Sequence, residues 1–191
     1  FEILNGVFPA AETGPRFALG FLPLGTGNSF LRDFTDQGAE HSIRALCEGK
    51  SRPCDVIRLT HRDGTLYYIN ILSIGFVAEV AALTNRRFKP FGPLAYIMGV
   101  VSKVFSLAPR PFPMKLDGIR EDREPVTFIS INNSRFTGGT MKMAPNASTS
   151  DGLADVIRVG PMGRLELLKT FPKIFKGTHV HHPAASTAQV R

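Results

Sequence analysis

The spacing of apolar and polar residues over the first 53 positions predicts one strand and two helical segments. Residues 16–23 (RFALGFLP) form a mostly apolar run, as in a strand buried on both faces of a parallel sheet. Residues 29–34 are compatible with a helix. Residues 37–49 (QGAEHSIRALCEG) place Ile43, Leu46 and Cys47 on one helical face before a glycine stop. Together these segments predict an α/β unit.

From Cys54 onward the pattern changes to short strands with Gly, Pro and Asn between them. Residues 55–60 (DVIRLT) and 65–72 (TLYYINIL) are strand-like, and Arg62-Asp63-Gly64 between them is typical of a hairpin turn. Further strands are predicted at residues 112–116, 125–132, 153–159 and 178–182. Such a series is typical of a β-sandwich or an open barrel. We therefore expect two domains, a partial α/β domain at residues 1–53 and a β-rich domain at residues 54–191.

One segment of the second part has the apolar spacing of a helix. Residues 93–108 (PLAYIMGVVSKVFSLA) place six apolar side chains on one face, namely Leu94, Ile97, Met98, Val101, Phe105 and Ala108. The segment is too short, and too interrupted by Ser102, Lys103 and Ser106, to span a bilayer. Two interpretations remain, a helix of the core and a helix that lines a lipid cleft.

The charge of the chain suits anionic partners. Its 191 residues include 23 Lys and Arg against 16 Asp and Glu, which gives a formal net charge of +7. Nucleotide phosphates and an acidic membrane surface fit this excess, and so does a basic surface that serves only solubility. Nucleic acid is not expected, because the chain has no basic block, only three Tyr and no Trp for stacking on bases.

The cysteines and the first residues bear on the compartment. Cys47 and Cys54 are too few for a disulfide framework, and their spacing matches no common zinc pattern. Reduced thiols in a cytoplasmic protein are therefore expected. The first ten residues (FEILNGVFPA) lack a signal-peptide pattern and an initiator Met, so we expect the chain to begin inside a larger protein.

The strongest local signal for chemistry is the glycine-rich turn at residues 22–33 (LPLGTGNSFLRD). A strand that feeds such a turn and then a helix N-terminus aims unpaired backbone N–H groups at one point, which favours a bound anion. Gly25 and Gly27 allow close approach to the backbone, and Thr26 adds a hydroxyl. The turn is neither a Walker loop nor a complete G-x-G-x-x-G fingerprint. A phosphate site and a plain tight turn both remain open.

Two further candidates concern metal. Asp151 lies in a polar, turn-prone run (STSDGLAD) just before a predicted strand, and a carboxylate among exposed carbonyls suits a hard cation such as Mg²⁺. The alternative is an Asp-Gly turn without metal. His179, His181 and His182 suggest a second metal site, but no third ligand is evident from the sequence. For these histidines we favour a solvated strand.

Four motifs, taken in order, resemble the diacylglycerol kinase catalytic family. Residues 23–32 (PLGTGNSFLR) are similar to its P-L-G-T-x-N-D-F-A-R signature, and residues 2–6 (EILNG) resemble the segment directly after its G-G-D-G-T loop. Residues 70–80 (NILSIGFVAEV) are similar to its N-x-x-S-x-G-x-x-A-x-V segment. Residues 132–156 contain NN, GG, APNA and DGLADV in the order of its N…G-G…P-x-A…D-G-x-L-D-V string. Each motif alone is weak, but together they cover nearly the whole chain.

The resemblance implies an ATP-dependent lipid kinase of phospholipid metabolism. Its fold would be a Rossmann-like nucleotide domain, here represented by its C-terminal part, followed by a β-sandwich-like domain with one or two helices. Gly25 and Thr26 would contact ATP, and the acceptor would be a diacylglycerol-like or sphingoid-base hydroxyl at a membrane surface. A structural Mg²⁺ would be held by the Asp151 side chain and the backbone carbonyls of Ser148 and Leu153. A homodimer and a peripheral membrane location are compatible with it.

Departures from the family pattern limit what this chain does alone. The chain begins after the position of the G-G-D-G-T loop, and the catalytic Asp of the family's D-G-E motif is expected beyond residue 191. Without these elements we expect the fragment to be inactive. Ser29 stands where many bacterial members carry Asp. An NAD kinase-like enzyme with a soluble acceptor and a non-catalytic nucleotide- or lipid-binding module remain as alternatives.

Overall fold

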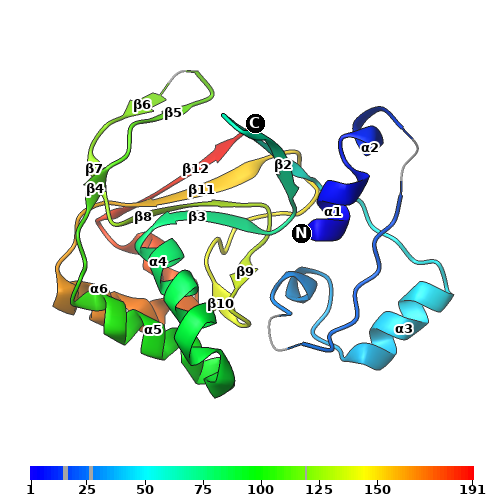
Figure 1. Ribbon diagram of the computed structural model, residues 1–191, viewed down its shortest axis with the longest axis horizontal. Coiled ribbons are helices and arrows are strands. Elements are labelled where there is room, and N and C mark those ends of the chain that lie inside the picture. Colours follow the sequence, from blue (N-terminus) through cyan, green and yellow to red (C-terminus); the bar gives the residue numbers. More distant parts are fainter. Residues whose placement is uncertain (15–16, 26–27, 119) are drawn as a thin grey trace.

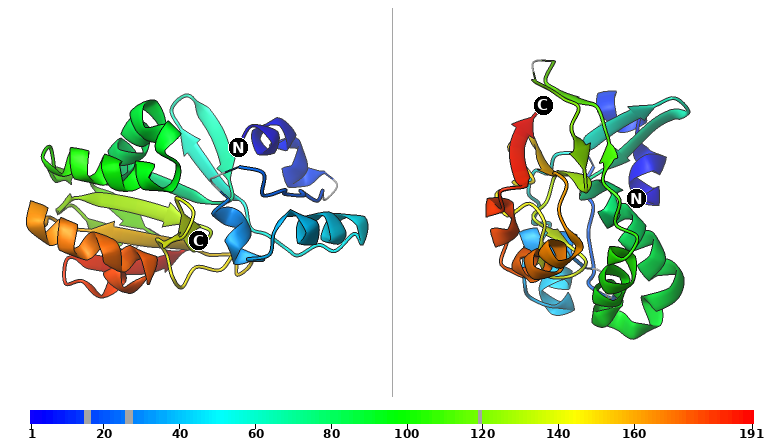
Figure 2. Two further views of the ribbon diagram at one scale, coloured as in Figure 1. Left: turned by 90° about the horizontal axis from the view of Figure 1, so that it is seen from below. Right: turned by 90° about the vertical axis from the view of Figure 1, so that its left-hand side faces the viewer.

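A computed structural model describes residues 1–14, 17–25, 28–118 and 120–191 of the chain (Figure 1). The N-terminal segment carries four short helical elements: α1 (Glu2–Val7), α2 (Ala10–Thr13), the 3-10 turn η1 (Phe30–Asp33) and α3 (Ala39–Cys47). In Figures 1 and 2 this blue-to-cyan segment lies beside one end of the β-rich part rather than on either face of its sheet.

The strand predicted at residues 16–23 is wrong for the residues that the structure describes, because residues 17–24 form no strand. A buried strand needs neighbours for its backbone N–H and C=O groups, and in the described part of the chain no ladder includes this segment. Its large side chains are accordingly open to solvent, among them Phe17, Phe21 and Leu24.

The helix predicted at residues 37–49 is confirmed as α3, but its expected apolar face is not packed. Ile43 and Leu46 are each about half exposed, at 50% and 51%, and Cys47 is exposed as well. The helical periodicity therefore predicted the helix correctly, but in the described part of the chain no other element covers its apolar face.

The predicted hairpin is confirmed. Strands β1 (Ile57–His61) and β2 (Gly64–Tyr68) pair in antiparallel register, with His61 opposite Gly64 across the Arg62-Asp63 turn. The single strand predicted at residues 65–72 is in fact two, because the chain breaks at residues 69–70 before β3 begins. This break moves β3 out of the hairpin and into the main sheet.

The main sheet has four antiparallel strands in the order β12-β11-β8-β3. They are β3 (Ile71–Gly75), β8 (Phe128–Asn132), β11 (Ala154–Val159) and β12 (Ala185–Val190). Residues alternate between the two faces of β8, so that Phe128 packs towards the helices while Ile129 packs with Val126 and Val156 on the opposite face. β8 and β11 carry the most buried residues of the sheet.

Each face of the sheet has its own cover (Figures 1 and 2). Helices cover one face: α4 (Phe76–Leu83), the π-helical turn η2 (Thr84–Phe88), η3 (Lys89–Leu94), α5 (Ala95–Val104), α6 (Arg164–Thr170), η4 (Phe171–Phe175) and η5 (Thr178–His181). The other face carries an extended ribbon of the paired strands β4 (Arg110–Pro111) with β7 (Pro125–Val126) and β5 (Met114–Leu116) with β6 (Arg120–Asp122). The hairpin β9 (Phe136–Thr137) and β10 (Met141–Lys142) lies between the sheet and the N-terminal segment.

This architecture confirms the predicted fold class, a mixed α and β chain that ends in a sandwich-like antiparallel domain. Three predicted strands are found close to their expected positions, as β5, β7 with β8, and β11. The strand predicted at residues 178–182 is wrong, since this segment is the 3-10 turn η5, and β12 follows it. The sequence also predicted one helix in this half, whereas α4 and α6 accompany α5.

The helix predicted at residues 93–108 is confirmed as α5, but the core face assigned to it is wrong. The buried positions are Ala95, Gly99, Val100 and Val104, while the predicted stripe of Leu94, Ile97, Val101 and Phe105 is exposed. Gly99 explains the difference, because the missing side chain lets α5 lie close to Val80 of α4. Among the described residues, no helix has the length and apolar character needed to cross a membrane.

Candidate functional site

The structure describes residues 22–25 and 28–33 of the glycine-rich segment. Thr26 and Gly27 lie outside the described residues, so the predicted position of Thr26 is not described. Gly25 is exposed, and its carbonyl oxygen accepts a hydrogen bond from the Asn28 side chain at 2.5 Å. Asn28, shortly before η1, is therefore tied to Gly25 by its side chain.

Two contacts tie η1 to the C-terminal half of the chain. The buried Ser29 hydroxyl accepts a hydrogen bond from the Gly139 backbone N–H at 2.8 Å. The Arg135 Nε donates to Asp33 Oδ1 at 2.8 Å, and the Arg135 backbone N–H donates to the same carboxylate at 3.3 Å. We call these four residues the η1 clamp. The clamp joins positions more than a hundred residues apart, with a separation of 102 between Asp33 and Arg135.

The clamp gives Ser29 a role that the sequence did not reveal. Ser29 departs from the resembled pattern, which has Asp at this place, yet it is buried and hydrogen-bonded within the fold. Gly139 has a φ of +93°, a conformation that favours glycine, and this conformation presents its N–H to Ser29. The Gly138-Gly139 pair of the family motif thus contacts the segment after the glycine-rich turn through the Gly139 backbone N–H.

Asparagines and an aspartate join the ends of β1, β3 and β8. The Asn133 side chain donates to the carbonyl oxygens of Asp55 and Ile69, at 2.8 and 3.0 Å. The Ser134 hydroxyl donates to the side-chain oxygen of Asn70. Because buried polar groups are costly without partners, these bonds fix the strand ends relative to one another.

Asp55 also holds the loop in which a metal ion was predicted. Its backbone N–H donates to the Thr149 carbonyl oxygen at 2.6 Å, and its carboxylate accepts from the Gly152 N–H at 2.7 Å. Within the loop, the exposed Asp151 carboxylate accepts from the Leu153 N–H at 3.1 Å. Asp55 therefore braces the loop against β1, whereas Asp151 shapes it locally.

The donor chemistry of this loop fits a hydrated Mg²⁺. Asp151 is exposed, and the one hydrogen bond that its carboxylate accepts from the described residues, from the Leu153 N–H, engages Oδ1 and leaves Oδ2 available. Burial raises the pKa of Asp155, and the negative charge of Asp151 raises it further. Within the described ranges no three His, Cys, Asp or Glu side chains are grouped to hold a metal. A cation here would depend on one carboxylate, backbone carbonyls and water.

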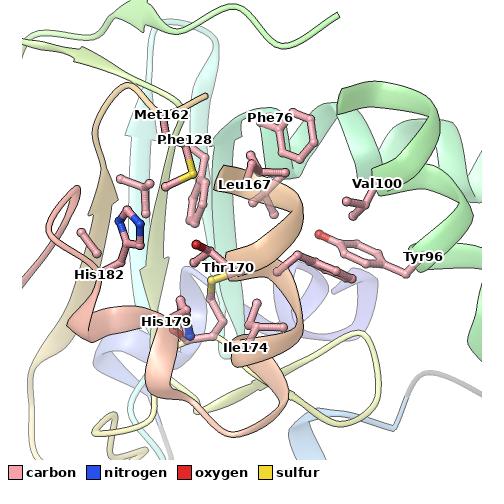
Figure 3. A pocket seen from close by; sticks show the side chains of 15 residues that line it. Phe76, Tyr96, Val100, Phe128, Met162, Leu167, Thr170, Ile174, His179 and His182 are labelled. Carbon is pink, nitrogen blue, oxygen red and sulfur yellow. Dashed lines mark hydrogen bonds between the residues drawn. The ribbon is translucent and has the colours of Figure 1, made fainter. Parts of the chain in front are cut away.

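A cavity of about 60 Å³ lies between the sheet and the helices that cover it (Figure 3). Its walls are mainly apolar, with Phe128 from the sheet, Phe76 and Val100 from α4 and α5, and Leu167 and Ile174 from α6 and η4. Tyr96 reaches into it from α5 and stacks on Phe171 with ring centroids 6.2 Å apart. The cavity is therefore a mainly apolar space inside the packed layers of this domain.

Two of the three histidines line this cavity, which corrects the expected solvated strand. His179 is buried, with 5% of its surface exposed, and its Nε2 lies 3.1 Å from the Met143 carbonyl oxygen. His182 Nε2 lies 3.2 Å from Glu166 Oε1, and His182 Nδ1 accepts from the Ala184 N–H at 3.1 Å. In Figure 3 both histidines lie on the side of the cavity opposite Tyr96.

Several residues of this site were missed from the sequence. Asp33, Arg135 and Asp55 act through partners far along the chain, and no local pattern marks such pairs. His179 was singled out only for metal, since a lone buried histidine gives no periodic signal. The turn at Gly25 and the Asp151 loop were found by motif, and no hydrogen bond between these two described segments joins them directly.

Comparison with known proteins accounts for most of the chain. The family model described as YegS C-terminal NAD kinase beta sandwich-like domain matches residues 70–191, and the one described as Diacylglycerol kinase catalytic domain matches residues 1–59. A protein named Diacylglycerol kinase from Mycobacterium tuberculosis is 31% identical over 181 residues, covering 93% of this chain and 59% of its own length. The chain thus spans well under two thirds of that relative.

Other relatives are similar over comparable lengths. A Bacillus subtilis protein named Diacylglycerol kinase is 27% identical, covering 94% of this chain and 58% of its own. A Shewanella frigidimarina protein named Probable lipid kinase YegS-like is 31% identical, covering 81% and 49%. The crystal structure of a diacylglycerol kinase from Bacillus anthracis aligns with a TM-score of 0.64 at 16% identity, covering 100% of this chain and 58% of that one. At this identity the structural likeness shows the fold.

Proposed function

Since the chain belongs to the YegS C-terminal NAD kinase beta sandwich-like domain family, and its first 59 residues match the diacylglycerol kinase catalytic domain, we propose that the protein containing it is an ATP-dependent lipid kinase. The γ-phosphoryl group would pass to a diacylglycerol-like or sphingoid-base hydroxyl, and ADP would leave. The observation that carries this proposal is the order of the two matched families along one chain, with an apolar cavity in the second.

On the nucleotide side, we assign ATP contacts to Gly25 and Thr26. The support is the glycine-rich sequence, the hydrogen bond from Asn28 to Gly25, and the η1 clamp, which ties the following residues to Arg135 and Gly139 on either side of β9. Phosphoryl transfer depends mainly on positioning and charge stabilisation, so a fixed turn is worth more here than a nucleophilic side chain.

On the metal side, the Asp151 carboxylate and the carbonyl oxygens of Ser148 and Leu153 would hold Mg²⁺. Mg²⁺ keeps several waters and accepts few protein ligands, which suits an exposed loop with one carboxylate. The bound ion would offset the negative charge of Asp151. The Asp155 carboxyl, whose pKa is raised by burial and then by Asp151, would ionise more readily as a result.

The protein would reach its substrate as a peripheral membrane protein through α5. The exposed stripe of Leu94, Ile97, Val101 and Phe105 repeats every three or four residues, so its members lie on one helical face, and Phe105 is 71% exposed. Arg86 and Arg87 of η2 lie on an element in contact with α5, and in the described part of the chain neither forms an ion pair. An exposed apolar stripe, together with two exposed cations on the element that contacts its helix, suits an anionic bilayer.

The kinase proposal is tested with full-length protein and labelled ATP. Diacylglycerol, a sphingoid base and NAD serve as acceptors in parallel, with and without Mg²⁺. We expect label in a lipid and none in NAD. Label in NAD alone would favour the NAD kinase-like enzyme, and ATP binding without transfer to any acceptor would favour a non-catalytic module.

The membrane surface is tested separately by sedimentation with vesicles of phosphatidylglycerol or phosphatidylcholine. In the membrane-bound protein the Phe105 ring would be buried in the bilayer, and Phe105→Ser removes this apolar surface. We therefore expect about tenfold weaker binding of the variant to the anionic vesicles. Phe112→Ser is the matched control, because Phe112 lies between β4 and β5 on the opposite side of the sheet. If both variants bind the anionic vesicles equally well, the α5 stripe is not the membrane-binding surface.

A further inference from the structure

Lys142 of β10 carries a charge that has no partner of opposite sign in the described part of the chain. Its ammonium group forms no ion pair with the described residues, although Lys142 is partly buried. Taking a cation out of water is costly unless an anion or another compensating group lies near it. A partly buried ammonium group without a carboxylate is therefore a candidate contact for an anionic ligand.

The ring of Phe136 holds this ammonium group in place. Phe136 and Lys142 are directly opposite each other in the hairpin β9–β10, and Lys142 Nζ lies 5.8 Å from the centroid of the Phe136 ring. A cation at this distance is attracted by the face of an aromatic ring. The lysine stem is also confined, because a Cβ added at Gly177 would lie 3.4 Å from Lys142 Cβ. The position of the charge is thus restricted from two sides.

The side of the hairpin that carries Phe136 and Lys142 points away from the core. Met141, the neighbour of Lys142 in β10, is buried and packs with Met143 and Ile174. Successive side chains of a strand point to opposite sides, so Lys142 lies on the side opposite to this cluster. The ammonium group therefore does not belong to the packed interior of the β-rich domain.

The same aromatic ring contacts the η1 clamp. Arg135 Cζ lies 5.4 Å from the centroid of the Phe136 ring, and Arg135 Nε donates to Asp33 Oδ1 of η1. Arg135 already neutralises the Asp33 carboxylate, and Lys142 adds a second positive charge beside this pair. One positive charge is thus left uncompensated among these residues, where the hairpin β9–β10 lies between the sheet and the N-terminal segment (Figure 1).

We propose that Lys142 binds the polyphosphate of ATP from the β-rich side, while the glycine-rich turn binds it from the other side. Ser29, which follows that turn, accepts a hydrogen bond from Gly139 in the turn of the same hairpin, so the hairpin that carries Lys142 is fixed next to the glycine-rich segment. An ammonium group offers several donors on a rotatable stem, which suits the oxygen atoms of a polyphosphate.

The inference rests on the proposed kinase function and adds to it a phosphate contact outside the glycine-rich turn. Lys142 would act by binding and positioning the phosphates, and no proton transfer is assigned to it. A fixed positive charge at the phosphates is useful in phosphoryl transfer, because this reaction depends mainly on positioning and on charge stabilisation.

The test measures the dissociation constants of ATP and of adenosine for full-length protein by calorimetry. Lys142→Met keeps an aliphatic stem and removes the charge. We expect the variant to bind ATP about tenfold more weakly, because a charge-assisted hydrogen bond to phosphate is lost, and to bind adenosine like the wild type. Unchanged affinity for ATP would overturn the inference, and so would an equal loss for adenosine, which has no phosphate.

Two further variants separate the contact from a general effect of charge or folding. Lys173→Met is the matched control, because Lys173 is exposed on η4 and also forms no ion pair with the described residues. It changes the net charge equally, so an equal loss of ATP affinity in both variants would overturn the contact. Lys142→Arg keeps the charge and should restore most of the affinity. An Arg variant that binds ATP as weakly as the Met variant would refute a role for the charge.

Chemical labelling tests the wild-type protein without any substitution. At an ATP concentration about ten times its dissociation constant, Lys142 should react with acetic anhydride about tenfold more slowly than without ATP, as followed by mass spectrometry. Adenosine should not slow this reaction, and Lys173 should react at the same rate throughout. Equal labelling of Lys142 with and without ATP would overturn the inference, even where a variant fails to fold.

Failure of the inference and failure of the proposed function have different results. Lipid phosphorylation by a protein in which ATP does not protect Lys142 refutes only the inference. Protection of Lys142 by ATP in a protein that phosphorylates no lipid acceptor supports the inference and refutes only the proposed function.

Discussion

Arg135→Met probes whether the η1 clamp orders the nucleotide side of the protein. Methionine keeps an aliphatic stem of similar length but removes the Nε donor that lies 2.8 Å from Asp33 Oδ1. The Asp33 side chain is only 3% exposed, and among the described residues its carboxylate would then keep just the hydrogen bond from the Arg135 backbone N–H, at 3.3 Å. Hydrogen bonds to charged groups contribute about 1.5–3 kcal/mol, and we take about 2 kcal/mol for this one.

This loss should act locally rather than on the whole fold. In the described residues, η1 is joined by hydrogen bonds to the C-terminal half only through the clamp, so about 2 kcal/mol less would favour its detachment by about thirtyfold. Backbone amides of residues 30–34 should exchange with solvent faster by up to that factor. The KM for ATP should rise by the same factor or less, because only the attached state binds.

The assays are hydrogen exchange by mass spectrometry and initial rates over a range of ATP concentrations at saturating lipid. Arg58→Met is the control, because its ion pair with Glu12 spans 3.4 Å at the surface and should contribute less than about 1 kcal/mol. A double-mutant cycle with Asp33→Asn should show strong coupling to Arg135 and none to Arg58. Faster exchange at residues 30–34 with an unchanged KM would refute the link between the clamp and the nucleotide.

Three further outcomes are expected. Gly75→Ala should lower the free energy of unfolding by about 3 kcal/mol in urea titrations, because Gly75 has a φ of +82° and an added Cβ would lie 2.7 Å from the Thr127 carbonyl oxygen; Gly6→Ala, with open space around it, should not destabilise. Asp151→Ala should raise the Mg²⁺ concentration needed for half-maximal activity more than it lowers the unfolding temperature, and a wild-type Mg²⁺ titration would remove this loop from the metal site. Burial lowers the pKa of His179 from 6.5 to about 4, so between these pH values the unfolded chain takes up a proton at this ring and the folded protein does not. The free energy of unfolding should therefore decrease by up to about 3 kcal/mol as the pH is lowered from 6.5 to about 4. His179→Gln should lack this decrease, and a variant with the same pH dependence as the wild type would refute the assignment.

The sequence predicted those features that depend on neighbouring residues. The hairpin at Arg62-Asp63-Gly64 and the strands β8 and β11 arise from turn chemistry and alternation, and both were placed within a few residues. The four motifs likewise led to the family, because their order along the chain carries information that no single motif has.

Features that depend on distant partners were not predictable in this way. The apolar stripe of α5 has the right period for a core helix, but the opposite face is buried because Gly99 allows a close approach to α4. β12 has few large apolar residues, and its pairing with β11 rather than its composition makes it a strand. The run at residues 17–24 is apolar enough for a strand, yet a strand forms only beside another.

The bonds of Asp55 have a consequence for how the chain is made. The N–H of Gly152, 97 residues further along, meets the Asp55 carboxylate, so this contact must wait until that loop has left the ribosome. At synthesis rates of about 5–20 residues per second, the wait is on the order of 5–20 seconds. During that time the hairpin β1–β2 can form, but the strand ends it leads to have no partners. We therefore expect the nascent chain to be most prone to aggregation over this interval, and mutations that weaken the Asp55 contacts to lower the yield of folded protein more than they lower its final stability.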